Sequence, residues 1–284
     1  MLRRLSLYVS FVRLGHSVFA LPFALVGALL AARQTPLTLA RVGWIIAAMV
    51  TARTAAMGFN RLVDARFDAL NPRTENRELP RGALSTRDAV ALVVVASLGF
   101  VLVTTQLGRL CLWLSPVALG IVFWYSLAKR FTTYTQMFLG LALAVAPVGG
   151  WLAAGGGAGV EPWLLALATG TWVAGFDIFY ACQDMEFDRI HGLNSIPARF
   201  GVRRSLSIAR WLHLATVIAL ASVALVTPLS GWYLAGVAGV GLLLTYEQSL
   251  VRVDDLSRVK QAFDLNGYVG FFYLAATAAA IYVD

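Results

Sequence analysis

Long apolar runs alternate with short polar gaps along almost the whole chain. Nine runs are long enough to cross a bilayer as a helix, which takes roughly 20 residues. Their approximate bounds are Ser17–Ala32, Val42–Gly58, Ala89–Leu107, Leu110–Leu127, Thr135–Ala154, Trp163–Cys182, Leu206–Val226, Trp232–Leu250 and Leu265–Val283. The runs lack the two-residue alternation of a barrel strand, and a backbone in lipid must satisfy its hydrogen bonds within the segment. The pattern predicts an all-α polytopic membrane protein with about nine transmembrane helices, forming a single domain over residues 1–284.

The composition supports this interpretation. Of the 284 residues, 59% are apolar and 13% are charged, and the mean hydropathy is +0.72. Soluble domains have about 45–50% apolar and about 25% charged residues. A globular core of this size could not hide so much apolar surface, so a soluble domain is excluded, as are a disordered chain, a collagen and a disulfide scaffold.

Basic residues are distributed unevenly between the two sides of the predicted bundle. With the N-terminus in the cytoplasm and the C-terminus outside, the outer loops hold only Arg33, Arg41 and Arg109 of the 23 lysines and arginines. Arg53 lies within a predicted helix, and the other 19 fall on the cytoplasmic side. The net charge of +8 therefore reports orientation rather than nucleic-acid binding. We expect a multi-pass protein of the cytoplasmic (inner) membrane whose working face is the cytoplasmic one.

Two polar segments, residues 60–88 and 177–204, stand out on that side. Each follows a helix that runs inward, and each carries an acidic pair, Asp64 and Asp68 or Asp184 and Asp188, with the second pair 120 residues after the first. This is a faint internal repeat, and it predicts that the two segments converge at one central cavity.

The acidic pairs extend to sets with helical spacing. The sets are Asn60, Asp64 and Asp68, and Tyr180, Asp184 and Asp188. Positions i, i+4 and i+8 share one helical face, where neighbouring carboxylates repel each other unless a cation compensates. The simplest alternative is a solvated helix end. Mg²⁺ prefers carboxylate oxygens and usually binds together with a phosphorylated ligand.

Basic residues accompany both acidic sets. They are Arg61, Arg66, Arg73, Arg77 and Arg81 in the first segment, Arg189 and Arg199 in the second, and Lys129 and Arg130 between them. Orientation alone explains any single arginine. Lys129 is one of two lysines and follows Tyr125 by a helical turn. Carboxylates and cations on one membrane face together predict a Mg²⁺–diphosphate site.

Arg53 lies within the apolar second run, seven residues before Asn60 and on the same helical face. An arginine at that depth costs several kcal/mol unless it faces a cavity or a partner. A structural ion pair is one explanation. We favour binding of an anionic substrate, because a guanidinium can match an anionic group bidentately.

Three motifs resemble those of a known family. N-x-x-x-D-x-x-x-D at Asn60, followed by N-P-R-T-x-x-R-x-L-P-x-G, resembles the first signature of the UbiA superfamily of intramembrane aromatic prenyltransferases. D-x-x-Y-A-x-x-D-x-x-x-D at Asp177, followed by S-I-P-A-R-F-G, resembles its second signature, and Y-x-x-x-K-R at Tyr125 matches a third feature. The resemblance covers essentially the whole chain.

The resemblance implies an enzyme that joins the prenyl group of a polyprenyl diphosphate to an aromatic acid in quinone synthesis. It implies two Mg²⁺ ions, one held by Asn60, Asp64 and Asp68 and the other by Asp184 and Asp188. It also implies diphosphate contacts from Lys129, Arg77 and Arg66. Arg199, which follows the second acidic set, is a further candidate for substrate binding. With the leaving group neutralised, the allylic C–O bond ionises, and Tyr125 and Tyr180 are candidates to stabilise the carbocation through their π faces.

The acceptor has two candidates. The start of the first run reads R-L-G-H-S-V-F-A-L-P-F-A-L, in place of the R-x-D-K-P-I-G-type entry common in 4-hydroxybenzoate enzymes of ubiquinone synthesis. It resembles a bacterial branch linked to menaquinone made by the futalosine route, whose acceptor is a dihydroxynaphthoate-type acid. Both acids therefore stay open, and the sequence shows no need for an obligate protein partner.

A secondary transporter is the alternative from another class, because transporters also combine internal repeats with intramembrane charge. A transporter would place its ionisable groups near the bilayer midplane. Here the acidic sets fall at cytoplasmic helix ends, which favours the enzyme.

Overall fold

The computed structural model describes residues 2–12 and 19–283, and the regular elements within these ranges are all helical. The α-helices are α1 (Leu2–Phe11), α2 (Leu21–Ala31), α3 (Leu39–Leu70), α4 (Thr86–Thr104), α5 (Arg109–Leu127), α6 (Thr135–Ala153), α7 (Glu161–Ala181), α8 (Met185–Ile190), α9 (Ile196–Val226), α10 (Gly231–Leu250) and α11 (Val259–Tyr282). Two 3₁₀ turns, η2 (Ala128–Arg130) and η3 (Cys182–Asp184), extend α5 and α7. The all-α prediction is confirmed.

Seven helices in the described ranges are long and apolar enough to cross a membrane: α3, α4, α5 with η2, α6, α7 with η3 and α8, α9, and α11. The other two predicted runs correspond to α2 and α10. Helix α2 has only 11 residues, and residues 17 and 18 of its predicted run lie outside the described residues. Helix α10 has 20 residues but is less apolar, because it is rich in glycine and carries Glu247 and Gln248. The count of nine spans and their orientation therefore stay predictions.

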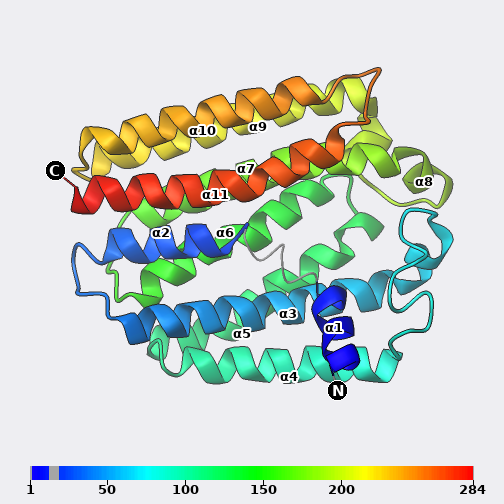
Figure 1. Cartoon of the computed structure of the whole chain (residues 1–284), viewed down its shortest axis with the longest axis horizontal. Coiled ribbons are helices and arrows are strands. Elements are labelled where there is room, and N and C mark those ends of the chain that lie inside the picture. The colour runs from blue at the N-terminus through cyan, green and yellow to red at the C-terminus, as the bar shows by residue number, and fades with distance from the viewer. Residues whose placement is uncertain (1, 13–18, 284) are drawn as a thin grey trace.

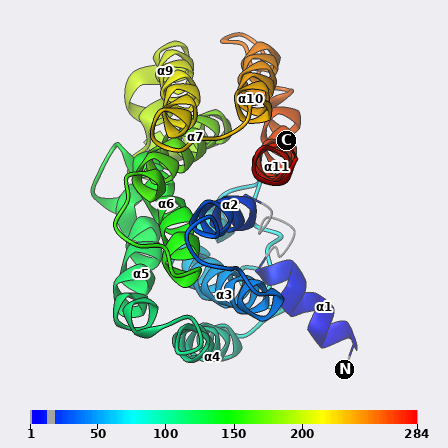
Figure 2. The ribbon, with the colours of Figure 1, turned by 90° about the vertical axis from the view of Figure 1, so that its left-hand side faces the viewer.

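The long helices lie roughly side by side, and α8 and the loop after α3 share one end of the bundle (Figure 1). Seen end-on, α3 to α6 follow one another around a curve with α2 inside it, and α7, α9, α10 and α11 continue beyond (Figure 2). The most extensive packing is between α6 and α7, α7 and α9, α3 and α4, and α2 and α6.

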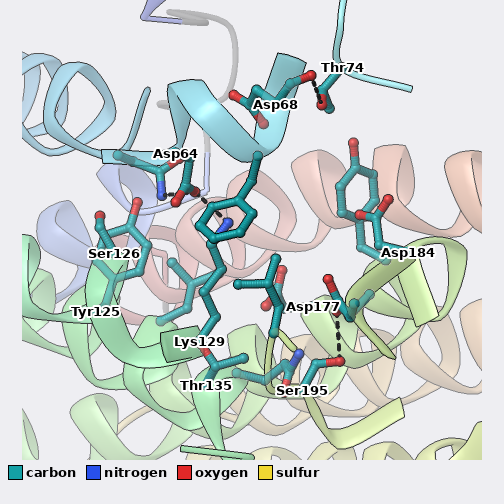
Figure 3. Close-up of a pocket in the computed structure, with 18 of the residues that line it drawn as sticks. Asp64, Asp68, Thr74, Tyr125, Ser126, Lys129, Thr135, Asp177, Asp184 and Ser195 are labelled. Carbon is teal, nitrogen blue, oxygen red and sulfur yellow. Dashed lines mark hydrogen bonds and ion pairs between the residues drawn. The ribbon is translucent and has the colours of Figure 1, made fainter. Parts of the chain in front are cut away.

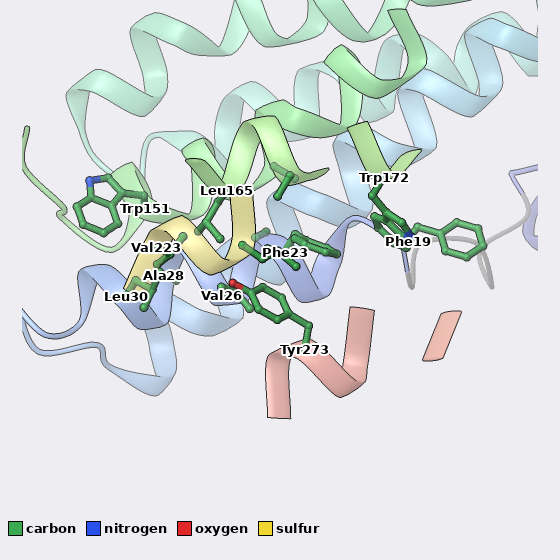
Figure 4. Close-up of a cluster of buried hydrophobic side chains, with 14 of the residues drawn as sticks. Phe19, Phe23, Val26, Ala28, Leu30, Trp151, Leu165, Trp172, Val223 and Tyr273 are labelled. Carbon is green, nitrogen blue, oxygen red and sulfur yellow. The ribbon is translucent and has the colours of Figure 1, made fainter. Parts of the chain in front are cut away.

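Helix α2 is buried at the centre of the largest apolar cluster (Figure 4). A helix that is apolar on all sides is suited to the core of a bundle or to the interior of a membrane, and eight of the 11 residues of α2 are buried. The Phe23 ring lies 4.9 Å from the Trp172 ring of α7 and 5.5 Å from the Tyr273 ring of α11, measured between centroids. Helix α2 therefore packs against helices from the middle of the chain (α6 and α7) and against the last helix, α11.

Helices α2 and α6 approach so closely that their backbones touch. A Cβ on Gly150 would collide with the carbonyl oxygen of Ala24, and a Cβ on Gly27 would collide with that of Pro147. Small residues allow such approach in membranes, where packing rather than the hydrophobic effect drives helix association.

Helix α1 lies against the end of α3 and fixes the loop that follows α3. Ser10 Oγ donates a hydrogen bond of 2.5 Å to Glu78 Oε1 in that loop. Phe11 is fully buried and packs in one cluster with Leu84 and Ala89. The loop between α3 and α4 is therefore anchored by apolar contacts as well as by its own hydrogen bonds.

Gly150→Ala should destabilise the bundle, because the added methyl group forces α2 and α6 apart. Overpacking of this kind costs about 1–3 kcal/mol. The control is Gly149→Ala, since a Cβ on Gly149 meets nothing within 4 Å and both changes raise helix propensity equally. We expect a lower midpoint of thermal unfolding in detergent for Gly150→Ala alone. Equal midpoints for the two variants would show that the contact does not limit stability.

Candidate active site

A polar cavity of about 290 Å³ brings the two polar segments together (Figure 3). Its walls come from α3, α5, α6, α7 and α8 and from the loops after α3 and α8. The charged, amide and tyrosine side chains that line it include Arg53, Asn60, Asp64 and Asp68 of α3, Arg73 and Arg77 of the first loop, Tyr125, Lys129, Asp177, Tyr180, Asp184 and Asp188. Most of the site residues predicted from the sequence therefore share one cavity.

Asp64 is buried on α3 and is held by two cations. Lys129 Nζ lies 2.7 Å from Asp64 Oδ2, and Arg130 Nη2 lies 3.1 Å from Asp64 Oδ1. Asn60 Nδ2, one turn earlier, donates to Asp64 Oδ2 at 3.4 Å. Helix α3 continues well beyond its apolar part, and this continuation carries the first acidic set at the spacing that the sequence predicts.

Asp68 is held by the loop that follows its own helix. Arg77 Nη1 donates to both carboxylate oxygens of Asp68, at 2.7 and 2.8 Å. Helix α3 ends at Asn71, whose extended backbone (φ −95°, ψ 119°) is the conformation that a following proline favours. The turn that begins there directs the loop back over the acidic face, where Thr74 Oγ1 donates to the Asp68 carbonyl at 3.0 Å.

The same loop reaches across the cavity to the second acidic set. Arg73 Nε donates to Asp184 Oδ1 at 2.9 Å, and Arg73 Nη2 pairs with Asp184 Oδ2. Arg73 Nη1 also donates to the Tyr180 hydroxyl at 2.7 Å. Burial disfavours the charged guanidinium, but the hydrogen bonds to Asp184 outweigh this effect and raise the pKa of Arg73. The Arg73 guanidinium therefore stays charged, and its contacts with Asp184 and Tyr180 fasten the first segment to the second.

Asp188 is held within the second segment. Ser195 Oγ donates to Asp188 Oδ2 at 2.8 Å and accepts from the Ala198 N–H at 3.3 Å, which makes Ser195 the N-cap of α9. Gly201, with φ of 75°, interrupts α9 six residues after Ser195 and turns the chain from the loop into the long part of the helix.

Arg53 and Tyr125 lie deeper and line a second cavity as well. This second cavity has a volume of about 380 Å³ and is lined mainly by aliphatic and aromatic side chains of α2, α3, α5 and α6. The buried Nε of Arg53 has no hydrogen-bond partner among the described residues. The polar cavity and the apolar cavity therefore adjoin each other at the side chains of Arg53 and Tyr125.

Two predicted residues lie elsewhere. Arg66 and Arg199 are exposed and do not line either cavity. Arg66 is two residues from Asp64, so it projects from the opposite side of α3.

Three residues without a predicted site role do contribute. Arg73 and Arg130 pair with the acidic residues, and Asp177 lines the cavity. Arg130 could have been selected from its place next to Lys129, and Asp177 from its position two helical turns before Asp184. Arg73 is among the basic residues that accompany the first acidic set, but its contact with Asp184 depends on how the loop folds.

The donor atoms suit magnesium. Within the ranges described, no three histidine, cysteine, aspartate or glutamate side chains come close enough to hold a metal ion by themselves. Mg²⁺ is usually bound by one or two carboxylates together with water and substrate phosphates, rather than by a cage of protein ligands. Two carboxylate pairs facing one cavity fit ions whose coordination a diphosphate would complete.

Comparison with known proteins agrees with this chemistry. The sequence pattern of the UbiA prenyltransferase family matches residues 20–275. A protein of Edwardsiella ictaluri (strain 93-146) named 4-hydroxybenzoate octaprenyltransferase is 34% identical over 230 residues, which are 81% of this chain and 79% of that protein. The apo structure of a UbiA homologue from Aeropyrum pernix K1 has a TM-score of 0.85 at 36% identity, covering 94% of this chain and 98% of the other.

A UbiA homologue from Archaeoglobus fulgidus, solved bound to DMAPP and Mg²⁺, has a TM-score of 0.72 at 19% identity over 98% of this chain and 99% of the other, and so shares the fold. The resemblance expected from the three motifs is confirmed by the family match and by the relatives above 30% identity. Membership of a family of transferases also favours the enzyme over the secondary transporter. The chain belongs to the UbiA prenyltransferase family.

Proposed function

We propose that the protein transfers a polyprenyl group from polyprenyl diphosphate to an aromatic carboxylic acid in the synthesis of a respiratory quinone. The observation that carries the proposal is the meeting of the two cavities. A charged chamber suits a diphosphate, and the adjoining apolar chamber suits a prenyl chain. The relatives named 4-hydroxybenzoate octaprenyltransferase and the homologue bound to DMAPP and Mg²⁺ support the same assignment.

The acidic sets are the proposed magnesium ligands. Asn60, Asp64 and Asp68 would hold one ion, and Asp184 and Asp188 the other. Bound Mg²⁺ would supply neutralisation of the charge on the leaving diphosphate. Lys129, Arg77 and Arg73 now neutralise these carboxylates. The same three cations border the cavity and would contact the diphosphate. They would therefore offset negative charge both in the empty site and in the site with Mg²⁺ and diphosphate bound.

The tyrosines and the apolar chamber protect the allylic carbocation. Tyr125 and Tyr180 line the polar cavity, and their aromatic rings could stabilise a cation, as the Tyr180 ring already does for Arg73, whose guanidinium carbon lies 4.9 Å from the ring centroid. The aliphatic walls of the second cavity exclude water, which would otherwise capture the carbocation and release a prenyl alcohol.

Arg53 is the proposed anchor of the acceptor. It lies where the two cavities meet, and its Nε is buried without a partner in the described part of the chain. The carboxylate of 4-hydroxybenzoate or of a dihydroxynaphthoate-type acid would satisfy this donor. Both acids carry the carboxylate, so Arg53 fits the ubiquinone and the menaquinone alternatives equally.

The proposed location is the cytoplasmic membrane of a bacterium, with the site facing the cytoplasm. Nineteen basic residues on one side support this orientation, and the relatives named 4-hydroxybenzoate octaprenyltransferase are bacterial proteins. Residues 1–284 are proposed to act as one domain.

Purified protein in lipid nanodiscs tests the proposal. Radiolabelled geranyl diphosphate or longer prenyl diphosphates are supplied with Mg²⁺ and either 4-hydroxybenzoate or a dihydroxynaphthoate. A prenylated acid supports the function, and the preferred acceptor distinguishes the two quinone alternatives. Absence of product with every aromatic acid in the panel would refute the proposal.

Asp64→Asn and Asp184→Asn should each lower turnover by at least about 100-fold, because each removes a charged ligand from the charge-neutralising centre. Excess EDTA should abolish the wild-type activity. The control is Asp264→Asn, since Asp264 is exposed on α11, pairs with Lys260 and lies outside both cavities. Near-wild-type turnover in either site variant, or full activity in EDTA, would rule out the magnesium mechanism.

Arg53→Lys should raise the KM for the aromatic acid by about tenfold or more, because lysine keeps the charge but loses the bidentate contact. The KM for the prenyl diphosphate should stay within about twofold of wild type. Steady-state kinetics with each substrate varied in turn measure both constants. If only the affinity for the diphosphate falls, Arg53 belongs to the metal–phosphate site.

A further inference from the structure

Asn71 lines the polar cavity but has no assigned task. It begins the N-P-R-T stretch after α3 and is 8% exposed. Its side-chain amide makes two contacts of opposite kind. Oδ1 accepts from the Arg73 N–H at 2.9 Å, and Nδ2 donates to Asp184 Oδ1 at 3.0 Å. One short side chain therefore joins the turn after α3 to a carboxylate 113 positions later.

The orientation of this amide follows from its two neighbours. A backbone N–H only donates, so the atom that faces Arg73 is the carbonyl oxygen of the amide. An ionised carboxylate only accepts, so the amide NH₂ group faces Asp184. The contact with Arg73 is an Asx turn, in which a side-chain oxygen accepts from the backbone two residues later. The turn therefore presets the direction in which Asn71 donates.

Asp184 is held by two neighbours that differ in charge and in exposure. Arg73 contacts both carboxylate oxygens, through Nε and Nη2, and its side chain is 31% exposed. Asn71 is neutral and buried, and it donates to Oδ1. A bidentate guanidinium competes with a metal ion for both oxygens, whereas an amide on Oδ1 leaves Oδ2 without a donor. Arg73 must therefore release Asp184 before this carboxylate can bind a metal ion.

Release of Arg73 changes what holds the Asp184 side chain in place. Asp184 is the last residue of η3, between α7 and α8. Without Arg73, Asn71 Nδ2 is the remaining hydrogen-bond donor to Asp184 in the described part of the chain. Hydrogen bonds of this kind orient the carboxylates that bind metals and strengthen metal binding. Asn71 can keep its bond because the Asx turn, and not Arg73's guanidinium, fixes its position.

We infer that Asn71 is a positioning residue for Asp184, which keeps this carboxylate oriented while Arg73 exchanges it for the diphosphate. This inference rests on the proposed function, which makes Asp184 a magnesium ligand and Arg73 a diphosphate contact. The loop after α3 then carries a fixed neutral donor and an exchangeable cation two residues apart. The two should have opposite effects, because loss of the donor weakens metal binding and loss of the cation removes a competitor.

Manganese binding, measured by electron paramagnetic resonance, tests the inference without turnover. Mn²⁺ replaces Mg²⁺, and the protein in nanodiscs is titrated with and without the unreactive analogue geranyl thiolodiphosphate. Asn71→Asp is isosteric and keeps an acceptor for the Arg73 N–H, but it loses the donor to Asp184. Asn71→Ser adds no charge; its hydroxyl also accepts from the Arg73 N–H, but it is one bond shorter and does not reach Asp184.

The matched control is Asn194→Asp. Asn194 lines the same cavity, but its amide donates to the Lys129 carbonyl oxygen rather than to an acidic residue. The substitution therefore adds the same charge to the cavity as Asn71→Asp and leaves the donor to Asp184 in place.

With the analogue present, Asn71→Asp and Asn71→Ser should each raise the half-saturating Mn²⁺ concentration by about tenfold or more, a loss typical of a removed partner of a metal ligand. Asn194→Asp should not raise it. In an Asp184→Asn background, Asn71→Ser should have little further effect, because the two residues act as a unit. Without the analogue, Arg73→Ala should lower the half-saturating concentration by about threefold or more.

Unchanged Mn²⁺ binding in both Asn71 variants would overturn the inference, as would an equal rise in Asn194→Asp. An undiminished effect of Asn71→Ser in the Asp184→Asn background would also overturn it, because Asn71 would then act through the fold of the loop. No fall in Arg73→Ala would refute the exchange. The titrations contain no acceptor, so a wild type that binds Mn²⁺ and the analogue but prenylates no aromatic acid would refute the proposed function alone.

Discussion

Compensation of negative charge at the end of an apolar bundle is the constraint on which the site depends. Five carboxylates in the described part of the chain line one cavity. Gathering them without cations would be prohibitive. Positive charge comes from Lys129 in η2 and from Arg73 and Arg77 on the loop after α3. The charge requirement therefore also fixes the path of the loop, because Arg73 must reach Asp184 in η3, at the end of α7.

The apolar half of the molecule obeys a different rule. Helices in lipid gain little from burying aliphatic surface, so the bundle relies on close contact. Backbone contact at Gly27 and Gly150 and the aromatic stack around Phe23 hold α2 against α6, α7 and α11. The apolar cavity lies beside this tightly packed region and shares Arg53 and Tyr125 with the polar cavity. Rigid packing on one side and fixed charges on the other position the two chambers relative to each other.

The sequence predicted the parts of the structure that depend on local periodicity. Apolar run length indicated the helices, and i, i+4 spacing placed Asp64 and Asp68 on one face of α3. The same geometry, applied to Arg66, would have directed it away from the site. Arg199 lies in the first turn of α9 and faces solvent, which spacing alone does not reveal. The contact of Arg73 with Asp184 joins residues 111 positions apart, so it depends on tertiary structure. Helix α10 was predicted as a span. Its glycines and Glu247 make its most apolar stretch less apolar than those of the seven helices that are long and apolar enough to cross a membrane.

The central place of α2 has a consequence for biogenesis. This helix is among the first to leave the ribosome, yet Phe23 packs against Tyr273, 250 positions later. The carbonyl oxygen of Ala24 must also wait for Gly150 of α6. Until those helices have been inserted, α2 has only lipid or transient neighbours. The contacts around α2 are completed only when α11 has been inserted. A nascent chain that stops before α11 therefore leaves the side of α2 that packs against Tyr273 uncovered.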